Sequence, residues 1–123
     1  MSEAGGEEST VVVVDDDAGI LEVYEAFLTD HYEVLTATSC EGGLARIDDG
    51  VDAVLLDRRM PDMSGDELLS ELRARGYEMP VAMVTGDRPD ADLAELPFDD
   101  CLEKPIGGDE LRSRVAALLD RGE

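Results

Sequence analysis

Short apolar segments alternate along this chain with segments in which apolar residues recur every three or four positions. Three of the apolar segments are continuous and β-prone, as expected for strands buried on both faces of a parallel sheet. The other two are more mixed, or short and flanked by charge, which is typical of edge strands. The predicted strands are, in chain order, Val11–Val14, Glu33–Ala37, Ala53–Leu56, Val81–Val84 and Asp100–Glu103.

Helical segments with recognisable N-caps follow the first three strands. Asp17 can cap a first helix, whose apolar residues fall on one face. The pairs Thr38–Glu41 and Ser64–Glu67 have the spacing of a capping box. The second and third helices are therefore expected to begin near residues 39 and 65.

The two later helical segments differ from each other. The last one has an apolar stripe between Leu111 and Leu119, whereas the segment between Thr85 and Lys104 contains two prolines. A fourth helix there has room for about two turns at most. Alternating strands and helices imply right-handed crossovers, and hence a parallel sheet with helices on both faces. We expect an α/β domain over residues 10–121, preceded by a disordered acidic tail over residues 1–9.

The charge of the chain is strongly negative: 31 acidic residues stand against 10 basic ones, for a formal net charge of -21. Binding to nucleic acid requires a basic footprint, so direct contact with DNA or RNA is not expected. No apolar run approaches the roughly 18 residues of a membrane span, and the N-terminus lacks the features of a secretory signal, so a cytoplasmic protein is expected.

The basic residues are almost all arginine, because Lys104 is the single lysine of the chain. An excess of Asp and Glu with scarce Lys favours a protein of halophilic cytoplasm, where concentrated salt screens self-repulsion. The alternative is an acidic domain without this adaptation.

Polar residues that could carry chemistry follow the predicted strands. In an open α/β sheet, ligands bind beyond the carboxyl ends of the strands. Three carboxylates at adjacent strand ends suggest a bound cation, and oxygen ligands near a phosphate suit Mg²⁺ better than Zn²⁺. An aspartate can act as a nucleophile on phosphorus when the cation and an ammonium neutralise the negative charges. The residues at these ends are Asp15, Asp16, Asp57, Thr85 and Lys104.

Four motifs carry a resemblance to a known family. They are Asp15-Asp16 after VVVV, the run from Asp57 to Gly65 (DRRMPDMSG), Thr85-Gly86 after VAMV, and Lys104-Pro105. From about Val11 to Leu119 the chain resembles the response-regulator receivers of two-component signalling, in particular those of halophilic archaea. The resemblance implies a flavodoxin-like (βα)5 fold with strand order 2-1-3-4-5.

The resemblance also implies a function: Asp57 accepts a phosphoryl group from a histidine kinase, or slowly from small phosphodonors. The domain then changes conformation and signals to a partner protein or an output domain. Such a domain is not an enzyme in the usual sense, because it catalyses only its own phosphorylation and dephosphorylation. The kinase, the output and the oligomeric state, including a homodimer, stay open.

Site roles follow from the same resemblance. Mg²⁺ or Mn²⁺ would be held by Asp16, Asp57 and the main-chain carbonyl of Arg59, with Asp15 acting largely through water. Thr85 and Lys104 would contact the phosphoryl group. The Lys104–Pro105 peptide bond would be cis, which proline permits at modest cost.

Two features depart from the common receiver pattern or vary within it. Cys101 stands three residues before Lys104, where receivers commonly have Tyr or Phe, so an aromatic switch is not expected. Arg59 and Asp87 occupy the two variable positions that tune phosphoryl lifetime in the family. Their opposite charges could pair across the site and restrict the hydrolytic water, or both side chains could simply be solvated.

Two other functions compete with the receiver interpretation. A phosphatase with an Asp nucleophile needs a second Asp two residues later as general acid, and Arg59 stands there. A pseudo-receiver would keep the fold without phosphorylation, and the complete set of acidic, Thr and Lys residues argues against it.

Overall fold

A five-stranded parallel sheet forms the centre of the molecule in the computed structural model, which describes residues 9–58, 60, 63–86 and 98–121. The strand order is β3-β2-β4-β5-β6. Renumbered along the chain this is 2-1-3-4-5, so the predicted flavodoxin-like topology is confirmed. The strands are β2 (Thr10–Val14), β3 (Glu33–Ala37), β4 (Ala53–Asp57), β5 (Val81–Thr85) and β6 (Asp100–Glu103).

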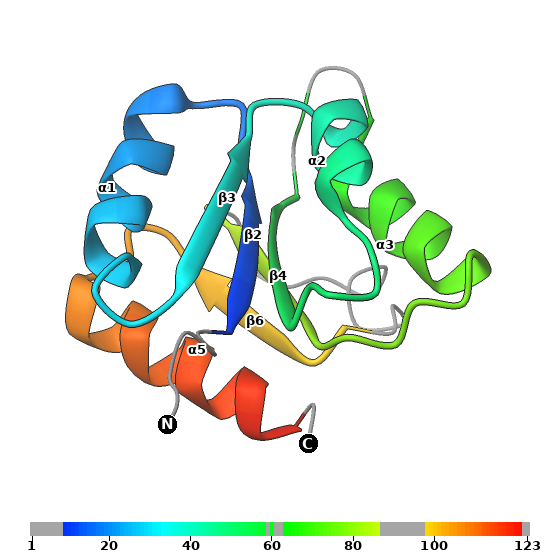
Figure 1. Cartoon of the computed structure of the whole chain (residues 1–123). Helices are drawn as coiled ribbons and strands as arrows, with labels where there is room; N and C mark the ends of the chain where they lie inside the picture. Colours follow the sequence, from blue (N-terminus) through cyan, green and yellow to red (C-terminus); the bar gives the residue numbers. More distant parts are fainter. Residues whose placement is uncertain (1–8, 59, 61–62, 87–97, 122–123) are drawn as a thin grey trace.

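Helices cover both faces of the sheet. In Figure 1, α1 (Ala18–Leu28) and α5 (Gly108–Arg121) lie on one side, and α2 (Cys40–Arg46) and α3 (Gly65–Ala74) lie on the other. Residues 87–97, nearly all of the segment predicted to hold a fourth helix, lie outside the described residues, as do residues 1–8 of the tail predicted over residues 1–9. None of the helices described is long and apolar enough to cross a membrane.

Alternate residues of the central strands supply two separate cores. Val11 and Val13 of β2 pack in the cluster that includes residues of α1 and α5, whereas Val12 and Val14 pack in the cluster that includes residues of α2 and α3. All four valines are 0–1% exposed. A strand that is buried on both faces must be apolar at every position, which explains the continuous VVVV run.

Two of the three predicted N-caps are confirmed. The carboxylate of Asp17 accepts hydrogen bonds from the backbone N–H groups of Gly19 and Ile20, at 2.9 and 3.2 Å. Ser64 and Glu67 form the reciprocal contacts of a capping box at the start of α3. Each cap satisfies helix N–H groups that have no partner within the helix.

The capping box predicted for Thr38 and Glu41 is wrong. Ser39 is the N-cap of α2, and its hydroxyl accepts a hydrogen bond from the backbone N–H of Gly42 at 3.0 Å. Thr38 and Ser39 both carry a capping hydroxyl, and the extended backbone of Ser39 (φ -145°, ψ 159°) directs the second one towards the helix. Helix α2 therefore begins at Cys40.

Candidate functional site

Those predicted site residues that the structure describes lie at one edge of the sheet. Asp15 directly follows β2, Asp57 ends β4, Thr85 ends β5, and Lys104 directly follows β6. These four strands are consecutive neighbours in the sheet and run parallel, so their carboxyl ends meet. Asp57 pairs with Val84, and Thr85 pairs with Glu103, so β4 and β5 each extend one residue further than predicted.

Backbone hydrogen bonds fix these strand ends. The N–H of Asp15 donates to the carbonyl of Ala37 at 3.1 Å, and the N–H of Lys104 donates to the carbonyl of Thr85 at 2.8 Å. The Asp15 carboxylate in turn accepts from the N–H of Asp17 at 2.9 Å. The Lys104–Pro105 peptide bond is cis.

Three carboxylates form a cluster at this edge. Ligand oxygens of Asp15, Asp16 and Asp57 all lie within 4.8 Å of one another. Asp15 is 1% exposed and Asp57 is 8% exposed, whereas Asp16 faces solvent. Buried carboxylates require a cation or hydrogen-bond donors close by, because burial removes their hydration.

Lys104 provides part of that compensation. Its Nζ lies 2.8 Å from Oδ2 of Asp15 and 3.5 Å from Oδ1 of Asp57. Burial opposes the charged ammonium, but the hydrogen bond to Asp15 and the negative charges of Asp15 and Asp57 outweigh it, so the pKa of Lys104 lies above its usual value. The ammonium is therefore charged throughout the neutral pH range.

The cluster fits a hard divalent cation. Carboxylate oxygens are the donors that Mg²⁺ prefers, and Asp16 leaves one side of the cluster open to water, which Mg²⁺ retains in its coordination shell. The main-chain carbonyl predicted as a further ligand belongs to Arg59, which lies outside the described residues. Asp87, the second residue predicted to tune phosphoryl lifetime, also lies outside them.

Tyr24 of α1 is a neighbour of the site that the sequence pattern assigned only to the apolar face of its helix. It lines a hollow of about 370 Å³ together with Lys104, Pro105 and three apolar residues. Burial raises the pKa of the Tyr24 hydroxyl; Lys104 lowers it, and Asp15 and Asp57 raise it further. Tyr24 thus packs as a neutral phenol beside Lys104.

Cys101 packs where the resemblance places an aromatic residue in other receivers. It is half-buried against the core cluster beneath α2 and α3. Burial raises the pKa of its thiol, as do the charges of Asp100 and Glu103, while Arg58 and Arg114 lower it. The thiol is therefore protonated at neutral pH and packs as a small apolar group.

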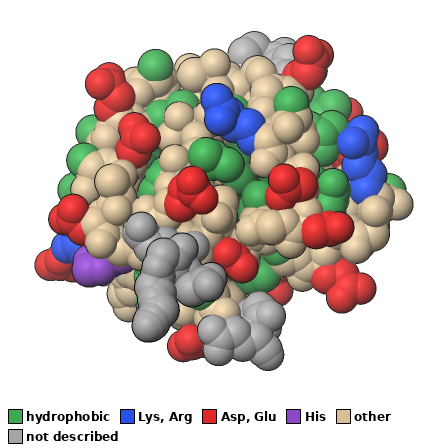
Figure 2. Space-filling view, in the orientation of Figure 1, with side chains coloured by type: hydrophobic (Ala, Val, Ile, Leu, Met, Phe, Trp, Pro, Cys, Tyr) green, Lys and Arg blue, Asp and Glu red, His purple; other side chains and the backbone are tan. Residues whose placement is uncertain are grey.

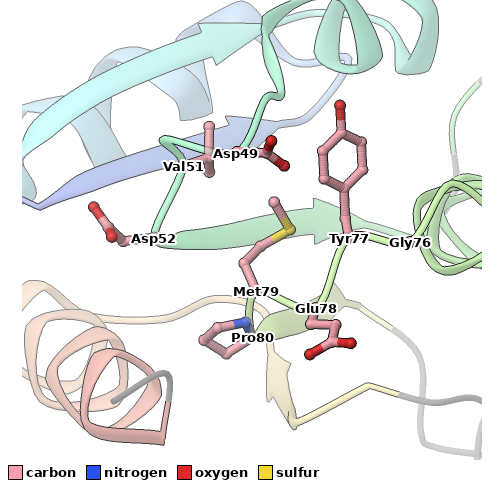
Figure 3. Close-up of a pocket in the computed structure, with 8 residues that line it drawn as sticks. All are labelled: Asp49, Val51, Asp52, Gly76, Tyr77, Glu78, Met79 and Pro80. Atoms are coloured by element: carbon pink, nitrogen blue, oxygen red, sulfur yellow. The ribbon is translucent and has the colours of Figure 1, made fainter.

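A polar hollow of about 540 Å³ lies at the opposite edge of the sheet. Figure 3 shows its lining side chains, which come from the segments that lead into β4 and β5. Asp52 and Pro80 of this lining immediately precede those strands, so the hollow lies at their amino ends, away from Asp57. It plays no part in the acidic site.

Comparison with known proteins agrees with this geometry. The sequence model of the response regulator receiver domain family matches residues 11–116. A putative transcriptional regulator of Haloferax volcanii is 45% identical over 93% of this chain and 20% of that protein. The transcriptional regulatory protein CiaR of Streptococcus pneumoniae is 36% identical over 90% of this chain and 51% of its own length.

A solved structure shares the fold. The CheY-like response regulator receiver domain protein of Methanospirillum hungatei superposes with a TM-score of 0.86 at 29% identity, over 94% of this chain and 97% of that one. The chain thus matches nearly all of this solved domain, but only about a fifth to a half of the two regulators described above.

Proposed function

Because this chain belongs to the response regulator receiver domain family, we propose that Asp57 accepts a phosphoryl group from a histidine kinase in a Mg²⁺-dependent reaction. The observation that carries the proposal is the position of the Lys104 ammonium between the carboxylates of Asp15 and Asp57 at adjacent strand ends. The receiver domain is a signalling domain, and we propose that its chemistry is limited to its own phosphorylation and dephosphorylation.

Asp57 is the nucleophile in the proposed reaction. A carboxylate oxygen of Asp57 forms a bond to phosphorus while the bond between phosphorus and the donor's histidine nitrogen breaks, and the electron pair of that bond leaves with the nitrogen. The product is an acyl phosphate. Lys104, already close to Oδ1 of Asp57, can move its ammonium onto a phosphoryl oxygen.

Thr85 and the carboxylates of Asp15 and Asp16 complete the proposed machinery. The hydroxyl of Thr85, on the strand next to Asp57, donates to another phosphoryl oxygen and favours the phosphorylated state. Asp15, Asp16 and Asp57, with the carbonyl of Arg59, would hold the divalent cation. When bound, Mg²⁺ or Mn²⁺ would neutralise the negative charge of acceptor and phosphate.

The partners and the setting follow from the same function. A cytoplasmic histidine kinase domain would be the donor, and an output domain or partner protein the receiver of the signal. The chain matches only 20% and 51% of the two related regulators, so those proteins have room for an output domain outside the matched part. We also propose that residues 10–121 form the domain, that a homodimer can form, and that this acidic segment does not itself contact nucleic acid.

The test is phosphorylation by a small donor. The protein is incubated with phosphoramidate or acetyl phosphate and Mg²⁺, and intact mass is measured for wild type, Asp57→Asn and Lys104→Met. We expect one phosphoryl adduct on wild type, none on Asp57→Asn, and a much slower reaction in Lys104→Met. A magnesium chelator should suppress the adduct.

Three results would overturn the proposal. Equal labelling of wild type and Asp57→Asn would place the acceptor elsewhere. Absence of an adduct on folded wild type, or sustained turnover of a phosphoester, would favour a pseudo-receiver or a phosphatase, respectively.

A further inference from the structure

A partly buried ion pair joins the residue after Asp57 to the first turn of α3. Nε of Arg58 lies 3.2 Å from Oδ1 of Asp66, and its Nη2 lies 3.2 Å from Oδ2. Only 10% of the Arg58 side chain and 26% of the Asp66 side chain are exposed. Two parallel N–H donors on one carboxylate fix distance and orientation together, which a lysine could not do.

The same two segments also touch through their backbones. The N–H of Gly65 donates to the carbonyl of Arg58 at 2.9 Å, and the N–H of Arg58 donates to the carbonyl of Val84 at 3.1 Å. A Cβ on Gly65 would lie 2.5 Å from the carbonyl oxygen of Asp57. The start of α3 is therefore pressed directly on the backbone of Asp57 and Arg58.

Arg58 thus connects two parts of the acceptor edge. Its backbone follows Asp57 and donates a hydrogen bond to Val84 of β5. Its side chain forms an ion pair with Asp66 of α3, which begins after the connecting residues 59–64. Without a bound cation, the carboxylates of Asp15, Asp16 and Asp57 repel one another, with Lys104 as the counter-charge described beside them. The ion pair between Arg58 and Asp66 holds the end of β4 in place, and so opposes movement of Asp57 away from the other two carboxylates.

We propose that Arg58 is a positioning residue of the acceptor site. Its ion pair with Asp66 holds the end of β4 in the geometry that a divalent cation requires, so that little ordering remains when the cation binds. The proposal rests on the function proposed above, because it takes the acidic cluster as the cation site.

The test is the Mg²⁺ affinity of the purified chain, measured by titration calorimetry without any phosphodonor. Arg58→Met keeps a long apolar side chain in the buried space but removes the donors, and Asp66→Asn removes the charge of the partner. We expect both variants to bind Mg²⁺ about tenfold more weakly than wild type, at the lower end of the effect of outer-shell partners.

The matched control is Arg75→Met just after α3. Arg75 also pairs with a carboxylate, that of Glu71 at 2.7 Å, but 51% of its side chain is exposed and the pair lies within one helix segment. We expect its Mg²⁺ dissociation constant to stay at the wild-type value. Arg58→Lys keeps the positive charge but lacks the two parallel N–H donors, so it should recover part of the Mg²⁺ affinity that Arg58→Met loses.

The outcomes separate this inference from the proposed function. Affinity is measured well below the melting temperature, so a loss of stability alone leaves the dissociation constant unchanged. If folded Arg58→Met and Asp66→Asn bind Mg²⁺ like wild type, Arg58 only stabilises the fold and the inference is overturned. If Arg58→Met does not fold, the Mg²⁺ affinity of Asp66→Asn alone decides. If wild type binds no Mg²⁺, or Asp57→Asn binds it equally well, the proposed function itself fails.

Discussion

At the scale of single residues, the carboxylates around Asp57 carry more negative charge than the ammonium of Lys104 neutralises. Asp15, Asp16 and Asp57 contribute three negative charges and Lys104 one positive charge, which leaves two negative charges in a small, partly buried space. Like charges at this separation disfavour one another, and the folded state bears that cost. A site of this kind is less stable than a neutral one would be.

Asp57→Asn should therefore stabilise the protein in the absence of divalent cations. The amide has nearly the same shape as the carboxylate and removes one of the repelling charges. We expect a gain of about 1 kcal/mol in unfolding free energy, and a melting temperature about 4 °C higher, measured by circular dichroism in a chelator-containing buffer.

The control is Asp30→Asn, which removes the same charge from an exposed residue between the end of α1 and the amino end of β3, whereas the cluster lies at the carboxyl ends of the strands. Its melting temperature should change much less. A lower melting temperature for Asp57→Asn than for wild type would show that contacts of the carboxylate outweigh the repulsion.

Cys101 shows a second residue-scale effect, this time on signalling. A half-buried thiol with a raised pKa offers neither a ring nor a charge that could follow the phosphorylation state. The buried Arg58 close to it, whose charge lowers the pKa of Cys101, belongs to the same region of the molecule. The relay of the signal therefore rests on parts other than an aromatic side chain at this position.

At the scale of elements, α3 approaches β4 closely beside the acceptor. Gly65 is the first residue of α3, and a Cβ there would meet the carbonyl oxygen of Asp57 at 2.5 Å and Cε of Met83 at 3.1 Å. Backbone atoms cannot move aside as a side chain can. The helix can approach the strand this closely because the residue is glycine.

Gly65→Ala should destabilise the protein although alanine normally favours a helix. The added methyl group must displace α3 from β4, and overpacking of this kind costs about 2 kcal/mol. Urea unfolding measures the change. Because the displaced helix carries Asp66, the Mg²⁺ affinity should fall as well.

Gly107→Ala is the control for this variant. Gly107 lies just before α5, and a Cβ there would meet no heavy atom within 4 Å. Its unfolding free energy should fall by less than about 1 kcal/mol, because Gly107 accepts the first hydrogen bond of α5 and alanine is a poorer N-cap than glycine. Equal stability of Gly65→Ala and wild type would contradict the close approach of helix and strand.

At the scale of the whole molecule, acidic side chains greatly outnumber basic ones. Figure 2 shows acidic side chains spread over the visible face, with basic side chains in only a few places. The formal net charge of -21 belongs to a chain of 123 residues. Self-repulsion on this scale opposes the compact state and weakens when salt screens it.

Salt should therefore raise the stability of the domain. We expect the melting temperature to increase by about 4 °C or more between low and molar KCl, corresponding to about 1 kcal/mol or more. Melting curves across a KCl series measure the effect. A melting temperature that does not rise would contradict the expected adaptation to concentrated salt, which the similarity to a Haloferax volcanii regulator also supports.

Much of the fold could be predicted because burial leaves a local pattern in the sequence. The strands β2, β4 and β5 are continuous apolar runs, since both of their faces are covered, and the capping residues Asp17 and Ser64 stand next to the helices that they begin. The second cap was missed because two adjacent hydroxyl residues compete there. Backbone geometry, which the sequence pattern does not reveal, selects Ser39.

By itself, the sequence determined the strands, the parallel sheet and the group of residues at its carboxyl edge, because hydrophobic periodicity and strand ends are local properties. Only the tertiary structure decided which charges meet. Lys104 contacts Asp15, 89 positions away, more closely than Asp57, and Arg58 is buried against Asp66. Such contacts depend on how the helices and strands pack in space, and no local pattern of residues encodes the distance between two side chains that are far apart in the sequence.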